Sequence, residues 1–370
     1  MRILVVNWQD RLNPEAGGAE VHLHEIFGRL AATGHEITLL VSGWEGATAE
    51  AVVDGMRVIR RGTRYSFPLH VRRGFRDITR ASPPFDVLVE DINKLPLFAP
   101  FWAGLPVVGL VPHLFGATAF QQERFPVAAT VWAAERLMPS AYRSCDFAVI
   151  SDSTASDLVR RGFRAERIHV SYPGIDHDFF KPGPDTGRAP DPCLAYVGRL
   201  RRYKGLDLVL RAVAKLREQG IEIRFRIVGQ GEDRERLARL ASELQLGSSV
   251  TFEGFVSEGH KLEILQTSWI NVYPSPKEGW GITNVEAAAC GTPSVASDSP
   301  GLRESVLDGV TGFLVPHDSV SAWATAIRRL VENPALRAEM GAQAVAHAGR
   351  FTWEQTAGEL EGMLQRSASL

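Results

Sequence analysis

The amino-acid sequence predicts an α/β protein made of two doubly wound, Rossmann-like domains. Short β-branched runs alternate with amphipathic helical patterns along the chain, and this alternation is typical of parallel strands joined by right-handed crossovers. A stretch rich in Pro and Gly, residues 180–192, interrupts the alternation and marks a connector. The length of 370 residues exceeds the size at which a single core keeps growing, so two domains are expected.

The predicted strands fall into two series, one on each side of the connector. The first series is Ile3–Asn7, Ile37–Val41, Val87–Glu90, Val107–Val111 and Phe147–Ser151. The second series is Cys193–Val197, Ile223–Val228, Val250–Phe252, Ile270–Tyr273 and Ser294–Ala296. We place the domains at residues 1–183 and 184–350. Because open α/β sheets bind ligands at the carboxyl ends of their strands, we expect the loops of both domains to face a shared cleft.

The composition excludes several classes of protein. Apolar residues at 45% and charged residues at 23% are ordinary for a soluble globular protein, and the net charge of −2 gives no global attraction to nucleic acid. Three scattered cysteines without a C-x-x-C pair exclude a disulfide framework and make a structural zinc site improbable. A reducing cytoplasm is therefore the expected location.

Two apolar stretches, one at the N-terminus and one at Leu95–Val111, fit neither a signal peptide nor a membrane span. The run at the N-terminus is too short for the apolar region of a signal peptide and predicts a buried first strand. The longest apolar stretch, Leu95–Val111, is broken by three prolines and a glycine and is shorter than the roughly 20 residues that span a bilayer. We interpret it as a helix followed by a buried strand.

The segment from Lys277 to Glu286 is the first candidate binding motif. It sets Glu278 and Glu286 eight residues apart around a glycine-rich turn that opens a helix. Gly279 and Gly281 allow positive φ and close approach of the backbone to a ligand, and the helix N-terminus presents N–H groups to an anion. Trp280, Ile282 and Thr283 complete this candidate site. Alternatively, Thr283 and Glu286 form a capping box that only begins the helix.

A second candidate motif, Gly198–Gly205, lies between a predicted strand and a predicted helix. It places Arg199 and Lys204 beside two glycines at the strand-to-helix turn. Cationic side chains together with backbone N–H groups in such a turn are suited to a diphosphate. A solvated lysine at a helix start is the alternative for Lys204, and the presence of both motifs in one chain favours the binding interpretation.

With these motifs the chain resembles the family 4 glycosyltransferases, which are retaining enzymes of the GT-B fold. The resemblance covers nearly the whole length. It also rests on Gly17-Gly18-Ala19-Glu20 after the first strand and on Tyr172-Pro173-Gly174-Ile175-Asp176 before the connector. It implies transfer of a sugar from a UDP- or GDP-linked donor to a hydroxyl of a glycan or lipid-linked acceptor, without a metal cofactor.

The resemblance also implies roles for the motif residues of the second domain, which would bind the nucleotide sugar. Arg199 and Lys204 would hold the diphosphate, whose negative charge grows as the glycosidic bond breaks. Glu286 would hold the ribose hydroxyls, and Glu278 would contact hydroxyls of the donor sugar. We assign no side chain as a nucleophile, because the usual proposal for retaining members is a same-face displacement.

The first domain would bind the acceptor and complete the site. The resemblance puts the backbone N–H groups of Gly17 and Gly18 against the diphosphate, although a plain glycine-rich turn is the alternative. His113 follows a predicted strand, where the family commonly has a histidine near the donor sugar, so we favour a catalytic, sugar-contacting role over a structural one. Residues 351–370, beginning Phe351-Thr352-Trp353-Glu354, resemble the last helix of the family, which returns to the first domain. Domain closure is implied as part of catalysis.

Three further polar clusters have competing interpretations. Residues 90–94 (Glu-Asp-Ile-Asn-Lys) end a strand and either contact the acceptor or cap a helix through Asn93. The string Asp176-His177-Asp178 has the form of a metal-binding motif of the other main glycosyltransferase fold, but here it approaches the connector and we set it aside. His22 and His24 point to different faces of a predicted helix and are poor joint ligands.

The segment Arg57–Arg80 is strongly basic in a chain that is slightly acidic. It contains eight arginines and a single acidic residue, Asp77, with Tyr65, Phe67 and Phe75 interleaved. Such an excess suggests peripheral contact with an anionic membrane or acceptor at the inner membrane face. The alternative is a solvated, mobile loop and helix face.

Other functions are weighed against the glycosyltransferase hypothesis. A sugar-nucleotide epimerase would keep the fold, and a phosphorylase would need a lysine-anchored pyridoxal phosphate and a longer chain. An NAD(P)-linked oxidoreductase is disfavoured because Gly229-Gln230-Gly231 has Arg at position 234 where the third glycine of the dinucleotide motif belongs. A binding subunit with an inactive site is a further alternative. Trp280 stands where relatives often have Phe, so the donor sugar is not inferred from them.

Overall fold

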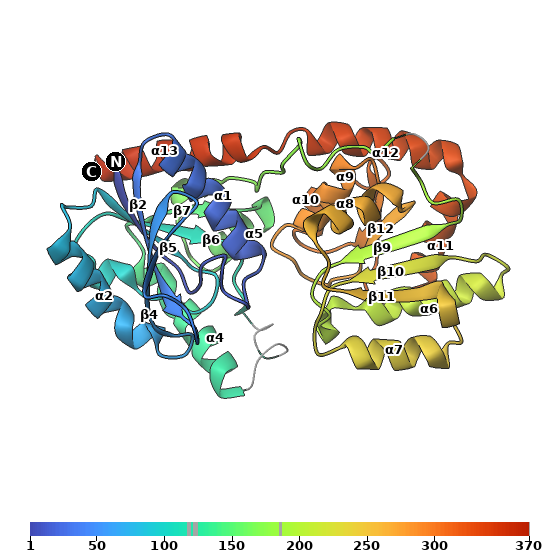
Figure 1. Ribbon diagram of the computed structural model, residues 1–370, viewed down its shortest axis with the longest axis horizontal. Helices are drawn as coiled ribbons and strands as arrows, with labels where there is room; N and C mark the ends of the chain where they lie inside the picture. The colour runs from blue at the N-terminus through green and yellow to red at the C-terminus, as the bar shows by residue number, and fades with distance from the viewer. Residues whose placement is uncertain (117–119, 121–124, 185–186, 370) are drawn as a thin grey trace. The chain divides into compact units, whose positions relative to one another are not determined.

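The computed structural model describes residues 1–116, 120, 125–184 and 187–369, and it divides into two compact units (Figure 1). Unit 1 comprises Met1–Gly174 together with the chain from Trp353 onward, and unit 2 comprises Ile175–Thr352. The division lies at 174/175 and 352/353, whereas the sequence placed it at 183/184 and 350/351. Residues after Gly174 join unit 2 because Ile175 forms a β-bridge with Thr352 and Gln266 donates a hydrogen bond of 2.8 Å to the carbonyl of Lys181.

Unit 1 is built on a sheet of eight described strands in the order β3-β4-β2-β1-β5-β6-β7-β8. The strands are β1 (Arg2–Val6), β2 (Glu36–Gly43), β3 (Glu50–Val53), β4 (Met56–Thr63), β5 (Val87–Asp91), β6 (Val107–Val111), β7 (Asp146–Val149) and β8 (Ile168–Val170). The helices are α1 (Gly18–Ala32), α2 (Phe67–Ala81), α4 (Phe125–Ala141), α5 (Asp152–Arg160), α13 (Trp353–Ala368) and the 3-10 turns η1 (Ala99–Phe101) and η3 (Ala165–Arg167). All strand pairs are parallel except β3 with β4. The winding changes direction beside β1, so the loops after β1 and β5 diverge there.

Unit 2 is built on a parallel sheet of six described strands in the order β11-β10-β9-β12-β13-β14. The strands are β9 (Cys193–Val197), β10 (Arg224–Val228), β11 (Val250–Gly254), β12 (Ile270–Tyr273), β13 (Ser294–Ser297) and β14 (Gly312–Val315). The helices are α6 (Leu206–Glu218), α7 (Arg234–Glu243), α8 (Glu258–Thr267), α9 (Ile282–Ala289), α10 (Leu302–Ser305), α11 (Val320–Glu332), α12 (Pro334–Ala348) and the 3-10 turns η4 (Arg202–Lys204) and η5 (Gly247–Ser249). Helices α6 and α7 lie on one face of the sheet, and α8 and α9 lie on the other (Figure 1).

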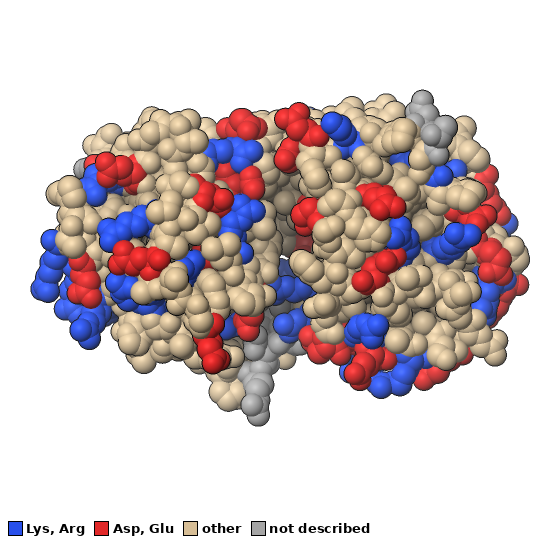
Figure 2. All heavy atoms as spheres, viewed as in Figure 1, with Lys and Arg blue, Asp and Glu red and all other residues tan. Residues whose placement is uncertain are grey.

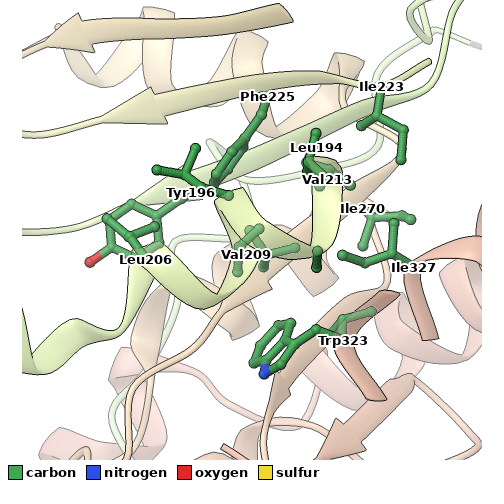
Figure 3. Close-up of a cluster of buried hydrophobic side chains, with 14 of the residues drawn as sticks. Leu194, Tyr196, Leu206, Val209, Val213, Ile223, Phe225, Ile270, Trp323 and Ile327 are labelled. Atoms are coloured by element: carbon green, nitrogen blue, oxygen red, sulfur yellow. The ribbon is translucent and has the colours of Figure 1, made fainter. Parts of the chain in front are cut away.

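The core of unit 2 shows why these residues form strands and helices. Leu194 on β9 and Phe225 on β10 are fully buried against Val213 of α6, and Trp323 and Ile327 of α11 close the same cluster (Figure 3). Burying one such side chain stabilises a fold by about 1.5–3 kcal/mol. The β-branched runs of the sequence are therefore strands because both of their faces are covered.

All ten predicted strands are confirmed, with small shifts at several ends. Four further strands, β3, β4, β8 and β14, were not predicted. The predicted helix in Leu95–Val111 is wrong, because only the 3-10 turn Ala99–Phe101 precedes β6. The backbone N–H groups of Leu97 and Ala99 donate to the buried carboxylate of Glu90, which fixes a turn in place of a helix. No helix in the described ranges is both long and apolar enough to cross a bilayer.

Helix α13 packs on α1, and His22 is buried at this contact. Its ring centroid lies 5.8 Å from that of Trp353, and neither ring nitrogen has a hydrogen-bond partner among the described residues. Burial lowers the pKa of His22 from 6.5 to about 4. The folded protein therefore keeps this imidazole neutral.

We predict that His22 makes the protein less stable in mild acid. Between pH 6.5 and 4 the unfolded chain binds a proton at His22 that the folded chain excludes, so stability falls as the pH falls. At pH 5 the loss attributable to His22 is about 2 kcal/mol, since one pKa unit corresponds to about 1.4 kcal/mol. Chemical unfolding at pH 7 and pH 5 should show a smaller acid loss for His22→Phe than for the wild type. Equal losses in the two proteins would contradict this assignment.

Candidate active site

The two binding motifs meet at the point where the second sheet changes its winding direction. Strand β12 pairs with β9, so the loops that leave these two strands start side by side. The first loop is Gly198–Gly205 and the second is Pro274–Gly281. Such a switch point is where open α/β sheets bind ligands.

The conformation of the first loop is set by close packing of its backbone. Gly205 has φ of +71°, and a Cβ at this position would lie 2.6 Å from the carbonyl oxygen of Pro274. Only glycine fits, and it ends the 3-10 turn that carries Lys204. The hydroxyl of Tyr196 donates to the carbonyl of Arg199 at 3.1 Å. The loop buries the Lys204 side chain and leaves Arg199 exposed.

Lys204 and Glu278 form a buried ion pair between the two loops. The Lys204 Nζ donates to Glu278 Oε1, and the two side chains are 8% and 16% exposed. The rings of Tyr203 and Tyr273 lie 5.1 and 5.4 Å from the ammonium. Burial lowers the pKa of Lys204, but the Glu278 carboxylate raises it further, and the net pKa lies above the ordinary value. Lys204 therefore stays protonated, with its charge paired to Glu278.

The second loop makes a glycine turn that begins α9. Gly281 has φ of +93° and is the residue before the helix, and a Cβ there would lie 2.7 Å from Leu302 Cδ2. Thr283 and Glu286 are both inside α9, so the capping-box alternative for them is wrong. The tight packing of Gly281 sets the start of the helix, and Glu286 is left with a different partner.

Glu286 points to a lysine that the sequence analysis did not single out. Its Oε1 accepts a hydrogen bond of 2.7 Å from Lys261 Nζ on α8. Its Oε2 is buried and accepts no hydrogen bond from any residue that the structure describes. Burial raises the pKa of Glu286, and the charge of Lys261 partly offsets the rise. No local signal in the sequence pointed to Lys261, because it lies on another helix.

A buried amide network orients α9 and was also missed. Asn271 of β12 donates to Asn284 Oδ1 at 2.8 Å and to Ser294 Oγ at 2.9 Å. Asn284 in turn donates to Ser305 Oγ at 3.1 Å. This network ties α9 to β12, β13 and α10, so the helix that carries Glu286 has a fixed direction.

Trp280, which lies in the turn from Gly279 to Gly281, packs its side chain against Phe351. The side chain is 2% exposed, and its ring lies 4.9 Å from that of Phe351 in an edge-to-face arrangement. Thr283 is buried, whereas Ile282 and Gly279 are partly exposed. The indole is therefore packed inside unit 2.

In unit 1 the Gly17-Gly18 motif begins α1. The N–H of Gly17 donates to Glu20 Oε2 at 2.8 Å, and Gly18 is the first residue of the helix. A Cβ at Gly18 would meet nothing within 4 Å. The backbone N–H of Gly17 is thus bound by a carboxylate of its own helix.

Residues 90–94 form a polar cluster beside this loop. Asn93 donates to Asn7 Oδ1 at 3.0 Å, so the suggestion that Asn93 caps a helix is wrong. Lys94 Nζ lies 3.0 Å from Gln9 Oε1 and 3.4 Å from Glu20 Oε1. These hydrogen bonds of Asn93 and Lys94 link the loop after β5 to the loop after β1 and to α1.

His113 follows β6 after one intervening residue, Pro112, as the sequence predicted. Its ring contacts that of Phe115 edge to face at 4.9 Å. The N–H groups of Phe115 and Gly116 donate to the carboxylate of Glu135, which also accepts from Arg161 at 2.9 Å. Glu135 and Arg161, which the sequence analysis missed, thus hold the loop that carries His113.

Two motifs set aside on the sequence have structural explanations. Asp176 Oδ1 accepts hydrogen bonds from the backbone N–H groups of Asp178 and Phe179, so it shapes a turn. No group of three or more possible metal ligands occurs among the described residues. A Cβ at Gly229 or Gly231 would lie about 2 Å from a carbonyl of the first loop, so these glycines serve loop packing.

The basic segment consists of most of β4, a short turn and most of α2, so its second half is the exposed helix face that the alternative interpretation expected. Five of its arginines have ion pairs, namely Arg57 and Arg61 with Glu50, Arg60 with Asp10, Arg64 with Glu15, and Arg73 with Asp77. Arg72, Arg76 and Arg80 are exposed along α2, and basic side chains gather at the left edge of Figure 2, over the position of α2 in Figure 1. The accessible charge is thus concentrated on α2.

We predict that Lys204 and Glu278 are coupled in stability. Removing one partner of a buried ion pair leaves an uncompensated charge and costs about 3–5 kcal/mol. Lys204→Met should therefore lower the free energy of unfolding strongly, and Lys204→Met/Glu278→Gln should recover part of the loss. A double-mutant cycle by urea unfolding measures this coupling, and strictly additive losses would argue against it.

Comparison with known proteins identifies the family. Residues 16–179 match the family described as Glycosyltransferase Family 4, and residues 183–347 match Glycosyl transferases group 1. D-inositol 3-phosphate glycosyltransferase 2 of Catenulispora acidiphila is 30% identical over 95% of this chain and 91% of that protein. The D-inositol 3-phosphate glycosyltransferase of Stackebrandtia nassauensis is 36% identical over 59% of this chain, and there the match spans 53% of the relative, about half of its length.

Solved structures support the fold. Sucrose-phosphate synthase from Thermosynechococcus elongatus superposes with a TM-score of 0.85 at 21% identity, covering 99% of this chain and 98% of that one. Anabaena HepE in complex with UDP-glucose superposes with a TM-score of 0.79 at 20% identity, covering 99% and 100%. The chain belongs to the family 4 glycosyltransferases, which are enzymes of the GT-B fold.

Proposed function

We propose that this enzyme transfers a sugar, with retention of configuration, from a nucleoside-diphosphate sugar to a hydroxyl acceptor. The observation that carries the proposal is the buried Lys204–Glu278 pair at the switch point of the second sheet. A permanent cation there suits the diphosphate, because the leaving group gains negative charge in the transition state. Arg199, exposed on the same loop, would add a second cation. These cations would make a metal unnecessary.

The two glutamates would hold the two ends of the donor. Glu278, fixed by Lys204, would accept hydrogen bonds from hydroxyls of the donor sugar. Glu286 would accept from the ribose, for which its unpartnered Oε2 provides the acceptor. The turn from Gly279 to Gly281 would let the backbone approach the donor.

Unit 1 would bind the acceptor and supply Gly17, Gly18 and His113. The donor base is proposed as uracil or guanine. UDP-glucose is the first donor to test because it is bound to HepE. Among acceptors, a polyol phosphate deserves testing beside glycans and lipid-linked sugars, because the relatives are D-inositol 3-phosphate glycosyltransferases.

We predict that Arg199→Ala and Lys204→Ala each lower kcat/KM by about 100-fold or more, the typical cost of removing one group that stabilises transition-state charge. Release of nucleoside diphosphate is measured after a thermal-shift screen has identified the donor. Arg224→Ala is the matched control, because Arg224 forms an exposed ion pair with Asp191 in the same unit. Conversion of the donor sugar without diphosphate release would instead indicate an epimerase.

We also propose that α2 contacts an anionic membrane. Arg72, Arg76 and Arg80 repeat at every fourth position, and Tyr65 and Leu69 beside them are 87% and 83% exposed. A helix with basic and apolar groups on its accessible side can lie in a membrane interface.

The expected result is recovery of the protein with anionic liposomes in low salt and weaker recovery with neutral ones. Arg72→Ser/Arg76→Ser/Arg80→Ser should weaken binding by about 100-fold, at about 1 kcal/mol per arginine. The matched control is Arg211→Ser/Arg234→Ser/Arg239→Ser, which removes exposed arginines from unit 2. Equal recovery with neutral and anionic liposomes would rule the contact out.

A further inference from the structure

Lys261 is a nearly buried lysine to which the proposed function gives no role. It lies in the first half of α8, and its side chain is 14% exposed. Its ammonium lies 2.7 Å from Glu286 Oε1, 3.2 Å from Glu258 Oε2 and 5.0 Å from the centroid of the Phe180 ring. These contacts place one positive charge directly against the carboxylate of Glu286.

The two carboxylate oxygens of Glu286 have different surroundings. Oε1 is bound by Lys261, whereas Oε2 is buried and has no donor within the described part of the chain. A buried acceptor without a donor costs about 1–3 kcal/mol. A ligand hydroxyl that donates to Oε2 would remove this cost, and a ribose offers two adjacent hydroxyls.

The charge state of Glu286 depends on Lys261. Burial raises the pKa of Glu286, Lys261 lowers it, and the nearby carboxylate of Glu258 raises it. Burial and the charge of Glu286 raise the pKa of Cys290 to about 12. Burial raises the pKa of Tyr273 well above its usual range, with Glu278 contributing more than Glu286, so both groups stay neutral. Without Lys261, Glu286 would tend to take up a proton and become a poorer acceptor.

We infer that Lys261 is a positioning residue for recognition of the donor's ribose. It binds Oε1 and favours the ionised form of Glu286, so that Oε2 accepts a hydrogen bond from a hydroxyl of the nucleoside. This inference rests on the proposed function, in which Glu286 holds the ribose. It implies that Lys261 governs affinity for ribonucleotides far more than affinity for nucleotides without ribose hydroxyls.

The test compares Lys261→Met with the wild type in binding UDP, GDP and their 2′,3′-dideoxy counterparts by calorimetry. Methionine keeps the length of the side chain and removes its charge. Affinity for the preferred ribonucleotide should fall about 10- to 100-fold, the range for a hydrogen bond to a charged group, and affinity for the dideoxy nucleotide should change little. Lys261→Arg should restore the ribonucleotide preference. The control is Lys215→Met. Lys215 lies on α6 and donates a hydrogen bond to Ser321 of α11, so its removal should leave both affinities unchanged.

The pH dependence supplies a readout that a purely structural role would not change. The ionised Glu286 is the stronger acceptor, so ribonucleotide affinity should fall as the pH drops through its pKa. In Lys261→Met this fall should begin at higher pH than in the wild type, and dideoxy affinity should not follow it. Lys261→Gln is a second variant with the same expectation, and thermal unfolding verifies that each variant is folded.

Equal weakening of ribonucleotide and dideoxy binding, or an unshifted pH profile, would overturn the role of Lys261. Retention of full nucleotide affinity by Lys204→Ala would instead overturn the proposed function itself. Loss of binding in Lys204→Ala, with an unchanged ribonucleotide preference in Lys261→Met, would overturn only the inference about Lys261.

Discussion

The site in unit 2 depends on the adjacency of β9 and β12. Because these strands pair, the loops that leave them meet, and Lys204 can reach Glu278. A buried ion pair loses so much solvation that well-packed apolar residues of similar size are often at least as stable. The pair is therefore poorly explained as a device for stability. In the proposed function the pair would instead place the Lys204 ammonium where the leaving diphosphate gains negative charge.

The two glutamates of the segment from Lys277 to Glu286 are held in the same way. Glu278 is held by Lys204 from the loop after β9, and Glu286 is held by Lys261 from α8. Each carboxylate is thus held in place by a lysine, so binding of a ligand there would require little reorganisation. The spacing of the glutamates is local, but both of their partners come from distant segments. Fixing the direction of α9 through Asn271 completes this arrangement.

The sequence predicted the strands and the two loops because these features have local signals, namely apolar runs and glycines at strand ends. It could not predict Lys261 or Glu135, because their contacts join segments with no common pattern. The start of α9 was ambiguous for a related reason. Thr283 is an acceptable cap by itself, and only the packing of Leu302 against Gly281 decides the outcome. Strand β4 was missed because its sequence does not alternate cleanly between apolar and polar residues. Met56, Val58 and Ile59 are buried, but arginines occupy positions 57, 60 and 61.

The hydrogen bonds of unit 1 suggest how the work of binding a diphosphate is divided. The N–H of Gly17 is donated to Glu20, and the N–H groups of Phe115 and Gly116 are donated to Glu135. Backbone groups near two of the predicted ligand-binding loops are thus already bound by carboxylates, and these carboxylates are themselves paired with cations, Glu20 with Lys94 and Glu135 with Arg161. A diphosphate needs positive charge as well as N–H donors, so Arg199 and Lys204 are better suited to neutralise it. In the proposed function the positive charge for the diphosphate would therefore come from Arg199 and Lys204 of unit 2.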